Sequence, residues 1–139
     1  MKSLLNIFSV SIGKRLFLLG FILVGYFNAY AQNNVQAVAK AMKQGDAKTI
    51  ALYFDKQIDL TFSDKSSTYG KRQAEVILQK FFSKIEPSDF LNVQYGTSVS
   101  NHTRFAIGQI NSNNGVYKVY LFFIQRDGEY LIRELRFEK

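Results

Sequence analysis

The amino-acid sequence predicts an α+β fold, in which helices lie on one face of a curved antiparallel sheet. Apolar residues recur at helical spacing in three segments between residues 33 and 85, and at alternate positions from Phe90 onward. The pairs Asn114-Gly115 and Asp127-Gly128 separate the last three alternating segments. Such pairs favour two-residue hairpin turns, because they adopt positive φ at little cost. The expected order is two helices, a strand, a third helix and a four-stranded antiparallel meander.

Two short helices are predicted first. The earlier one has Asn33 or Asn34 as its N-cap and Gly45 as its C-terminal stop. Asp46 can cap the later one. The apolar positions with helical spacing are Val35, Val38, Ala39 and Met42 in the first helix and Ile50, Tyr53 and Phe54 in the second.

A half-buried strand, a polar loop and the third helix are predicted next. The strand carries Ile58, Leu60 and Phe62 at alternate positions, and residues 63–68 form the loop. Gly70 precedes the third helix, and Pro87 prevents its continuation. The apolar stripe of this helix consists of Ala74, Ile77, Leu78, Phe81, Phe82 and Ile85.

The meander strands are expected near residues 90–99, 103–112, 116–126 and 129–138. Two-residue turns fix the residues that face each other. The expected partners are Phe122 with Arg133, Tyr120 with Leu135, Ile107 with Phe122, and Gln109 with Tyr120. One face then carries Phe105, Ile107, Gln109, Tyr120, Phe122, Ile124, Leu131, Arg133, Leu135 and Phe137. The other carries Ala106, Gly108, Ile110, Tyr117, Val119, Leu121, Phe123, Ile132, Glu134 and Arg136.

Both of these faces are largely apolar, but helices on one side can cover only one. We expect the second face, with Val119, Leu121, Phe123 and Ile132, to need a partner, because a large exposed apolar patch is uncommon on a soluble monomer. A two-fold homodimer packed sheet against sheet is the simplest solution. The alternative is that the last strand curls and the early helices wrap further round the sheet.

Residues 1–31 differ in composition from the rest and predict a secretory signal peptide. Three basic residues are their only charges, and the apolar run 16–27 is shorter than the ~20 residues that a membrane-spanning helix needs. Ala29 and Ala31 are the small residues that a signal peptidase site requires. We expect cleavage between Ala31 and Gln32, a periplasmic or secreted product and no stable membrane anchor. An uncleaved anchor is the alternative.

Composition excludes several function classes for the remaining domain, residues 32–139. The chain has no Cys and one His, so a disulfide framework, a thiolate zinc site, a cysteine nucleophile and a lipoprotein anchor are excluded. No phosphate-binding loop or metal-ligand spacing is present, and we expect no metal and no cofactor. Residues 1–31 hold three of the 18 basic residues and none of the 11 acidic ones, which leaves a net charge of +4. Nucleic acid is therefore not an expected partner.

A candidate pocket combines Gln109, Tyr120 and Arg133 on the first apolar face. Arg133 suits a carboxylate or phosphate, while Gln109 and Tyr120 would orient a small anionic ligand. The alternative is that Arg133 extends past the sheet edge and that Gln109 and Tyr120 bond to each other.

Enzymatic proton abstraction would need a carboxylate base on an apolar wall and an acid such as Tyr. The face with Tyr120 has no Asp or Glu, Glu134 lies on the opposite face, and Asp59 could enter a pocket only if its strand turned the polar side inward. A catalytic dyad would need His102, which we expect in an exposed turn. No catalytic residue is therefore predicted.

Four segments carry a family resemblance, namely residues 69–82, 105–108, 114–120 and 131–139. They resemble a family of small exported proteins of Gram-negative bacteria that has the label of a domain of unknown function. That family resembles the nuclear transport factor 2-like superfamily, which is also described as cystatin-like α+β. The resemblance implies a cone of curved sheet and helices that often encloses a pocket and often dimerises through the sheet. It implies no particular activity, because the superfamily includes both enzymes and non-catalytic modules.

The sequence therefore predicts an exported, non-enzymatic binding or protein-interaction module. The alternative is a small enzyme of the isomerase or dehydratase type that uses the cone pocket. A third hypothesis is an accessory protein that binds an envelope protein through the second sheet face and needs no pocket.

Overall fold

The structure, a computed structural model, describes residues 29–98 and 102–139. By its internal contacts the chain divides into two units, Met1–Asn33 and Asn34–Lys139. The apolar run 16–27 of the expected signal peptide lies outside the described residues. Within the described ranges, no helix is long and apolar enough to cross a membrane.

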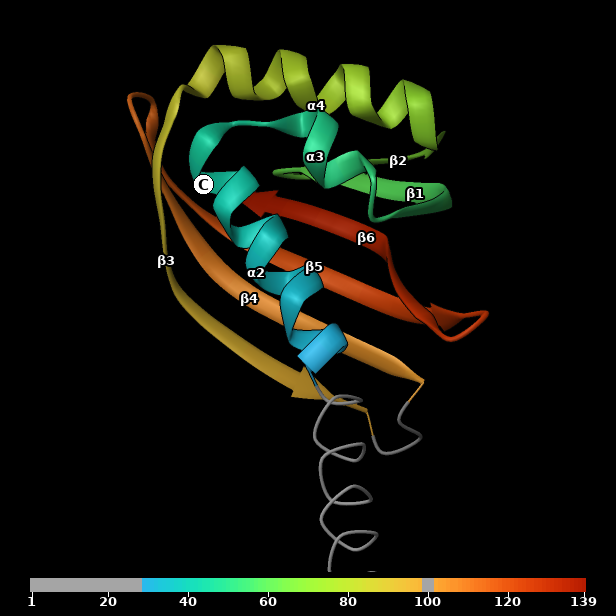
Figure 1. Cartoon of the computed structure of the whole chain (residues 1–139). Helices are drawn as coiled ribbons and strands as arrows, with labels where there is room; N and C mark the ends of the chain where they lie inside the picture. Colours follow the sequence, from blue (N-terminus) through green and yellow to red (C-terminus); the bar gives the residue numbers. More distant parts are fainter. Residues whose placement is uncertain (1–28, 99–101) are drawn as a thin grey trace, which may run out of the picture. The chain divides into compact units, whose positions relative to one another are not determined.

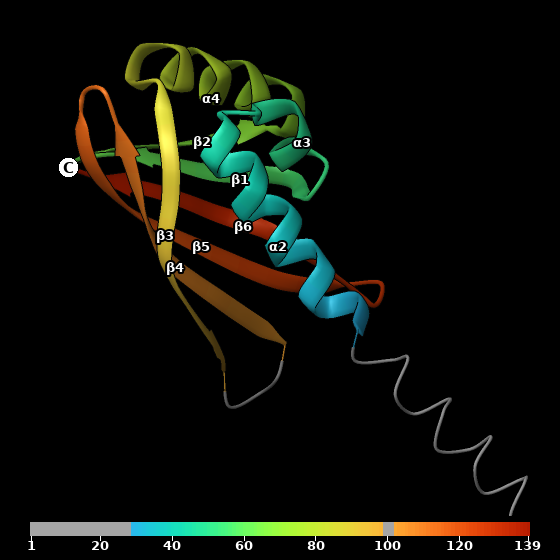
Figure 2. The ribbon, with the colours of Figure 1, turned by 60° about the vertical axis from the view of Figure 1, so that its left-hand side comes forward.

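The predicted α+β fold is confirmed. The elements in chain order are α2 (Ala29–Gln44), α3 (Ala47–Ala51), β1 (Phe54–Phe62), β2 (Lys65–Gly70), α4 (Lys71–Ile85), β3 (Pro87–Thr97), β4 (Thr103–Ser112), β5 (Gly115–Arg126) and β6 (Glu129–Glu138). The six strands form one sheet in the order β2-β1-β6-β5-β4-β3. Its pairs are antiparallel except β1 with β6, which are parallel. The sheet curves around α2, and α4 crosses one end of it (Figures 1 and 2).

The junction of α2 and α3 follows the predicted capping signals. Gly45 adopts a φ of 65°, which glycine tolerates at a helix C-terminus, and the Asp46 side chain accepts a hydrogen bond from the Thr49 amide. The N-cap prediction for Asn33 or Asn34 was wrong, because α2 already begins at Ala29. The alanines around the two asparagines favour the helix strongly enough to include them.

The third predicted helix is α4. Gly70 is its N-cap in an extended conformation, and Glu86 ends it with a φ of 49° immediately before Pro87. Ala74, Leu78, Phe82 and Ile85 are buried, as the apolar stripe predicts. The chain then continues directly into β3.

The polar loop predicted for residues 63–68 is instead mostly strand β2, which pairs with β1. Ser63 turns the chain with a φ of 57°, and its amide bonds to the carbonyl of Phe137. Thr61 donates to the Ser66 hydroxyl, and side chains bond across the same pair of strands elsewhere. Strand β2 is an edge strand, and all but one of its residues face solvent. Its residues are therefore polar, and its sequence resembles that of a loop.

The two hairpins of the meander differ in how well they follow the predicted turns. Asp127 and Gly128 have φ values of 50° and 82°, which is the positive-φ pair expected there. The β4–β5 turn lies one residue earlier than predicted, and its positive φ of 111° falls on Gly115, which pairs with Ser112. The expected partners in β4 are therefore corrected: Phe105 faces Phe122, Ile107 faces Tyr120, and Gln109 faces Lys118.

A bulge at Arg133 corrects the predicted pairing of β5 with β6. Phe123 pairs with Ile132, as the turn predicts, but Phe122 pairs with Glu134. Arg133 is the extra residue, so the alternation of β6 changes phase there. Tyr120 consequently faces Arg136, and Leu135 and Phe137 join Ile132 on the core side of the sheet.

The predicted dimer face was wrong, because it is the face that the helices cover. Val119, Leu121, Phe123 and Ile132 are at most 2% exposed and belong to the same core as Val38 and Met42 of α2. On this covered face, a glycine makes room for an aromatic ring of the neighbouring strand. A Cβ at Gly108 would lie 2.4 Å from the Phe90 ring, so the ring occupies the space that this glycine leaves.

Aromatic rings fill the end of the core beneath α4. The centroid of the Phe81 ring lies 4.6 Å from that of Phe62 and 4.7 Å from that of Phe137. Tyr117 meets the edge of the Phe81 ring at 5.6 Å. This end of the cone is therefore packed side chain against side chain.

Removal of the Asp46 cap tests the α2–α3 junction. We expect Asp46→Ala to lower the free energy of unfolding by about 1 kcal/mol at neutral pH, and Asp46→Asn to cost much less. The side chain of Thr49, more than its amide, lowers the pKa of Asp46 in the folded protein. The charge-dependent part of the stabilisation is thus present at neutral pH and lost as the pH falls below about 4. Urea denaturation at several pH values measures this, and equal stability of all three proteins at neutral pH would contradict it.

Added methyl groups test the two glycines against which phenylalanine rings pack. We expect Gly108→Ala to lower the free energy of unfolding by about 1–3 kcal/mol, because the buried Phe90 ring has nowhere to move. Gly96→Ala is the matched control. Its Cβ would meet the Phe105 ring, which is 42% exposed and can turn outward, so its cost should be smaller. A larger loss for Gly96→Ala would contradict the assignment of the two faces.

Candidate functional site

The three residues predicted to form a pocket do not converge. Gln109 donates to the Asn111 side chain at 3.2 Å, and Arg133 donates to the backbone carbonyl of Gln57 at 2.8 Å. Tyr120 lines a groove on the outer face of the sheet, to which Gln109 and Arg133 do not contribute. The bulge separates Arg133 from the other two, because it directs this side chain toward β1.

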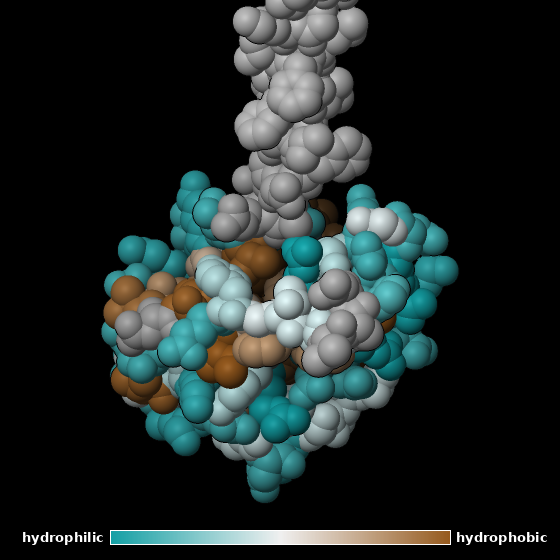
Figure 3. Space-filling view, turned by 90° about the horizontal axis from the view of Figure 1, so that it is seen from below, coloured by the Kyte–Doolittle hydropathy of each residue, from teal (hydrophilic) through white to brown (hydrophobic). Residues whose placement is uncertain are grey.

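The outer face of the sheet, opposite the helices, carries an apolar groove of about 330 Å³. Its centre is the cross-strand pair Phe105 and Phe122, whose exposed fractions are 42% and 38%. The complete lining is Phe105, Ala106, Ile107, Tyr120, Leu121, Phe122, Glu134 and Arg136. Viewed from the end away from α4, apolar side chains reach the surface on the side where β3 lies in Figure 1 (Figure 3).

Charged side chains of both signs border this outer groove on β6. Arg136 bonds to Glu134 at 2.8 Å and lies 3.7 Å from Glu138. The hydrogen bond with Glu134 raises the pKa of Arg136. On β5, the Lys118 ammonium lies 5.1 Å from the centre of the Tyr120 ring, and a hydrogen bond with Tyr120 is the main cause that raises the pKa of Lys118. The groove therefore has an apolar centre and a bipolar rim.

Asp55 is the one acidic residue that is buried among the described residues, with 2% of its side chain exposed. Its carboxylate accepts a hydrogen bond from Arg126 Nε at 3.0 Å and lies 3.9 Å from Arg133 Nη1. It also accepts a bond from the Lys56 amide at 2.8 Å. Two arginines thus compensate the negative charge of Asp55, and its carboxylate oxygens are occupied by hydrogen bonds within the protein.

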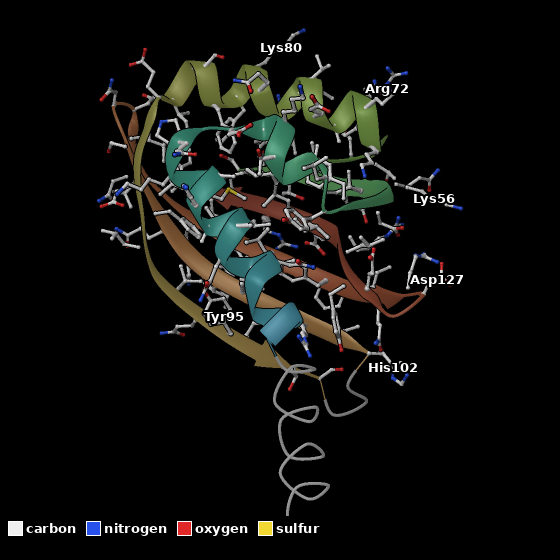
Figure 4. The ribbon with its side chains drawn as sticks, in the orientation of Figure 1. Lys56, Arg72, Lys80, Tyr95, His102 and Asp127 are labelled. Atoms are coloured by element: carbon white, nitrogen blue, oxygen red, sulfur yellow. The ribbon has the colours of Figure 1, made fainter. Side chains whose placement is uncertain are left out.

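The other side chains considered for catalysis are not brought together. His102 is exposed at the end of the sheet away from α4 (Figure 4). Asp59 and Glu134 are paired across β1 and β6, where Asp59 accepts a bond from Thr68 and Glu134 accepts one from Arg136. In the described part of the chain, no group of three His, Asp or Glu side chains could hold a metal ion.

Arg104 is a core-facing charge that sequence reasoning missed. It pairs with Phe123, which is buried, so its side chain starts on the face that the helices cover. The guanidinium carbon lies 3.8 Å from the centre of the Tyr130 ring. The signal in the sequence is the alternation of Arg104 with Ala106, Gly108 and Ile110, which places a cation in register with buried positions.

Solved structures with little sequence identity share the fold. A nuclear transport factor 2-like protein of unknown function from Shewanella oneidensis is 12% identical over 77% of this chain and 94% of its own, with a TM-score of 0.58. A putative isomerase from Bacillus subtilis is 19% identical over 78% of this chain and 84% of its own, with a TM-score of 0.60. The chain therefore has a nuclear transport factor 2-like fold. No curated protein matches its sequence.

Another solved structure is more similar to this chain in sequence than these two. The crystal structure of a DUF4783 family protein from Bacteroides ovatus matches with 30% identity over 74% of this chain and 92% of that one, with a TM-score of 0.70. The family model for DUF4783, described as a domain of unknown function, matches residues 35–138. This protein therefore belongs to the DUF4783 family, in agreement with the resemblance of its sequence.

Proposed function

We propose that this protein is an exported, non-enzymatic interaction module that forms a homodimer through the outer face of its sheet. The observation that carries the proposal is the exposed aromatic pair of Phe105 and Phe122 at the centre of the groove. Aromatic anchors surrounded by polar groups are typical of protein interfaces. This outer face of the sheet is opposite to the one that the sequence predicted as the dimer interface.

A second copy of this chain suits the outer groove because its charges are self-complementary. Glu134, Arg136 and Glu138 follow one another along the rim, with the cation between the two anions. In a two-fold interface the same patch meets itself, so Arg136 of each copy can approach an acidic side chain of the other. Apolar centres then meet while opposite charges pair at the edges.

The alternative, a small enzyme of the isomerase or dehydratase type, has less support. Such chemistry needs an ionisable base in the interior. Among described residues the buried carboxylate is Asp55, and it bonds to Arg126 and to a backbone amide. The end of the core beneath α4 is filled by aromatic rings. The likeness to a putative isomerase concerns the fold, which hosts many functions.

Export by a cleaved signal peptide is part of the same proposal. It rests on the basic start, the apolar run 16–27 and the small residues Ala29 and Ala31. Cleavage before Gln32 removes the first three residues of α2 and leaves the unit Asn34–Lys139 intact. The product would act in the periplasm or after secretion.

Charge placed in the groove should break the dimer without unfolding the subunit. We expect Phe122→Lys to raise the dissociation constant about 30-fold or more, which is the effect of losing a buried aromatic anchor. The new ammonium faces Glu134 across the strands, so the fold is preserved. Sedimentation velocity of the chain beginning at Gln32 measures the change.

Val76→Lys is the matched control for the interface, because Val76 is 54% exposed on α4 rather than on the sheet. It should leave the dissociation constant unchanged. A monomeric parent protein, or equal effects of the two substitutions, would refute the proposed interface.

Substitution of Asp55 tests whether its carboxylate has a structural or a catalytic role. We expect Asp55→Asn to lower the free energy of unfolding by about 1–3 kcal/mol, because two arginines lose their anion. The lower part of this range is expected if the half-exposed Arg126 becomes hydrated. Thermal and urea denaturation measure the loss. Unchanged or increased stability would instead favour the enzyme alternative, since catalytic residues are often held at a cost in stability.

A further inference from the structure

Helix α4 carries most of the excess positive charge of the domain. Its 15 residues include the basic residues Lys71, Arg72, Lys80 and Lys84 and one acidic residue, Glu75. The helix therefore has a net charge of +3, whereas residues 32–139 together have a net charge of +4. The rest of the domain is close to neutral, so its excess charge is concentrated at the end that α4 covers.

Three of these cations lie in one row on the exposed face of α4. The row consists of Arg72, Val76, Lys80 and Lys84, whose four-residue spacing makes their side chains neighbours along the helix. All four side chains are exposed. Arg72 and Lys80 point away from the body of the molecule (Figure 4). We call these four residues the basic row.

The stability of α4 does not explain the basic row. Arg72 lies in the first turn, where the helix dipole disfavours a cation, and this turn contains no acidic residue. Lys84 suits the dipole in the last turn, but it follows Lys80 at four-residue spacing, and like charges so placed destabilise a helix. In the part of the chain that the structure describes, none of these three cations forms an ion pair. Their charges are therefore available to an external anion.

The shape of this surface favours a flat partner over a small ligand. α4 lies across one end of the sheet, and no other described element lies beyond it in either view of the ribbon (Figures 1 and 2). The hollow beside Val76 is lined only by residues of α4 between Glu75 and Ser83, so no second element forms a wall. From residue 72 to residue 84 the row extends over about 18 Å. A convex ridge touches a plane along its whole length, whereas a small ligand needs a concave site.

We propose that the basic row of α4 docks this protein on the surface of a phospholipid bilayer with anionic headgroups. Each basic side chain near such a surface contributes to binding, and clusters of about four or more on a helix are typical of proteins that bind anionic lipids. Lys71, which donates to the Leu52 carbonyl at 3.3 Å, adds a fourth cation at the edge of the row. Val76 lies between the cations, where an apolar side chain can enter the headgroup region.

This docking is peripheral and reversible, because the apolar stripe of α4 is buried in the core and is not free to enter the bilayer. The groove of the proposed dimer lies on the outer face of the sheet, opposite the helices. Binding of the bilayer through α4 therefore does not depend on the dimer.

Vesicle co-sedimentation tests the proposal. The chain beginning at Gln32 is used, because it contains the whole unit Asn34–Lys139 and lacks the apolar run 16–27, which would itself bind a bilayer. At low ionic strength it should bind vesicles of equal parts phosphatidylglycerol and phosphatidylcholine at least about tenfold more tightly than vesicles of phosphatidylcholine alone. Salt at about 1 M should abolish the difference, because it screens charges beyond about 3 Å. Equal binding to both kinds of vesicle, or binding to neither, would overturn the proposal.

Paired substitutions assign the binding to the basic row. Arg72→Gln combined with Lys80→Gln should weaken binding to the anionic vesicles about 30-fold, because two cations are lost. Lys40→Gln combined with Lys56→Gln is the matched control. It removes the same charge from exposed residues of α2 and β1 and should weaken binding less than about threefold. Equal effects of the two pairs would mean that only the net charge matters, and would contradict the assignment to α4.

A single tryptophan locates the contact, since the chain contains none. The fluorescence of Val76→Trp should shift to shorter wavelength when the anionic vesicles are added, because the indole enters the headgroup region. Tyr95→Trp is the control, because Tyr95 is exposed at the end of the sheet away from α4 (Figure 4). A shift for Tyr95→Trp without one for Val76→Trp would contradict the proposed orientation.

An acidic polypeptide is the other partner with the right charge. The protein should stay on the vesicles when poly-glutamate is added at the same concentration of charge, because a flexible chain loses conformational entropy when it lies along the row. Release from the vesicles would show that an acidic chain is preferred, and would overturn the bilayer as the partner. None of these readouts involves association of two copies, so their failure is distinguishable from failure of the proposed dimer.

Discussion

The bulge at Arg133 is the constraint on which the arrangement of the sheet depends. Without the extra residue, Ile132 and Leu135 would lie on opposite faces of β6, and one of them would leave the core. The bulge places both residues inward. Side-chain hydrogen bonds stabilise it: Arg133 donates to the Gln57 carbonyl, and nearby Arg126 donates to the Asp55 carboxylate. The buried carboxylate thus belongs to the architecture of the β1–β6 junction. Its engagement there is also the main physical argument against a catalytic role.

Division of the sheet into a covered and an uncovered face links this architecture to the proposed function. The helices cover the side on which Gly108 makes room for Phe90. They leave Phe105 and Phe122 partly exposed on the other side, within a rim that contains charges of both signs. The same covered side retains Arg104 at the end away from α4, where its Nε has no acceptor among the described residues. The uncovered face is therefore the surface on which the proposed dimer forms.

Much of the fold could be predicted from the sequence, because capping residues, Pro87 and the Asp127-Gly128 turn act locally. The covered face could not, since both faces of β5 are apolar and alternation alone does not distinguish them. The bulge is a long-range feature without a local signal, so the pairing of Arg133 was wrong and the pocket of Gln109, Tyr120 and Arg133 did not form. Edge strand β2 was hidden by its polar composition. Alternation places Arg104 on the face of Ala106 and Gly108, but its inward position follows only once it is known that the helices cover this face.

Thiol labelling tests the central claim most directly, because the chain contains no cysteine and each introduced thiol can be followed alone. Val119→Cys and Phe122→Cys place a thiol on opposite faces of β5. The account predicts that the thiol at position 119 reacts only as fast as the protein unfolds. The thiol at position 122 should react rapidly, because it lies on the uncovered face and the substitution also removes the aromatic anchor of the proposed dimer. Rapid labelling at position 119 with protection at position 122 in the monomer would contradict the account.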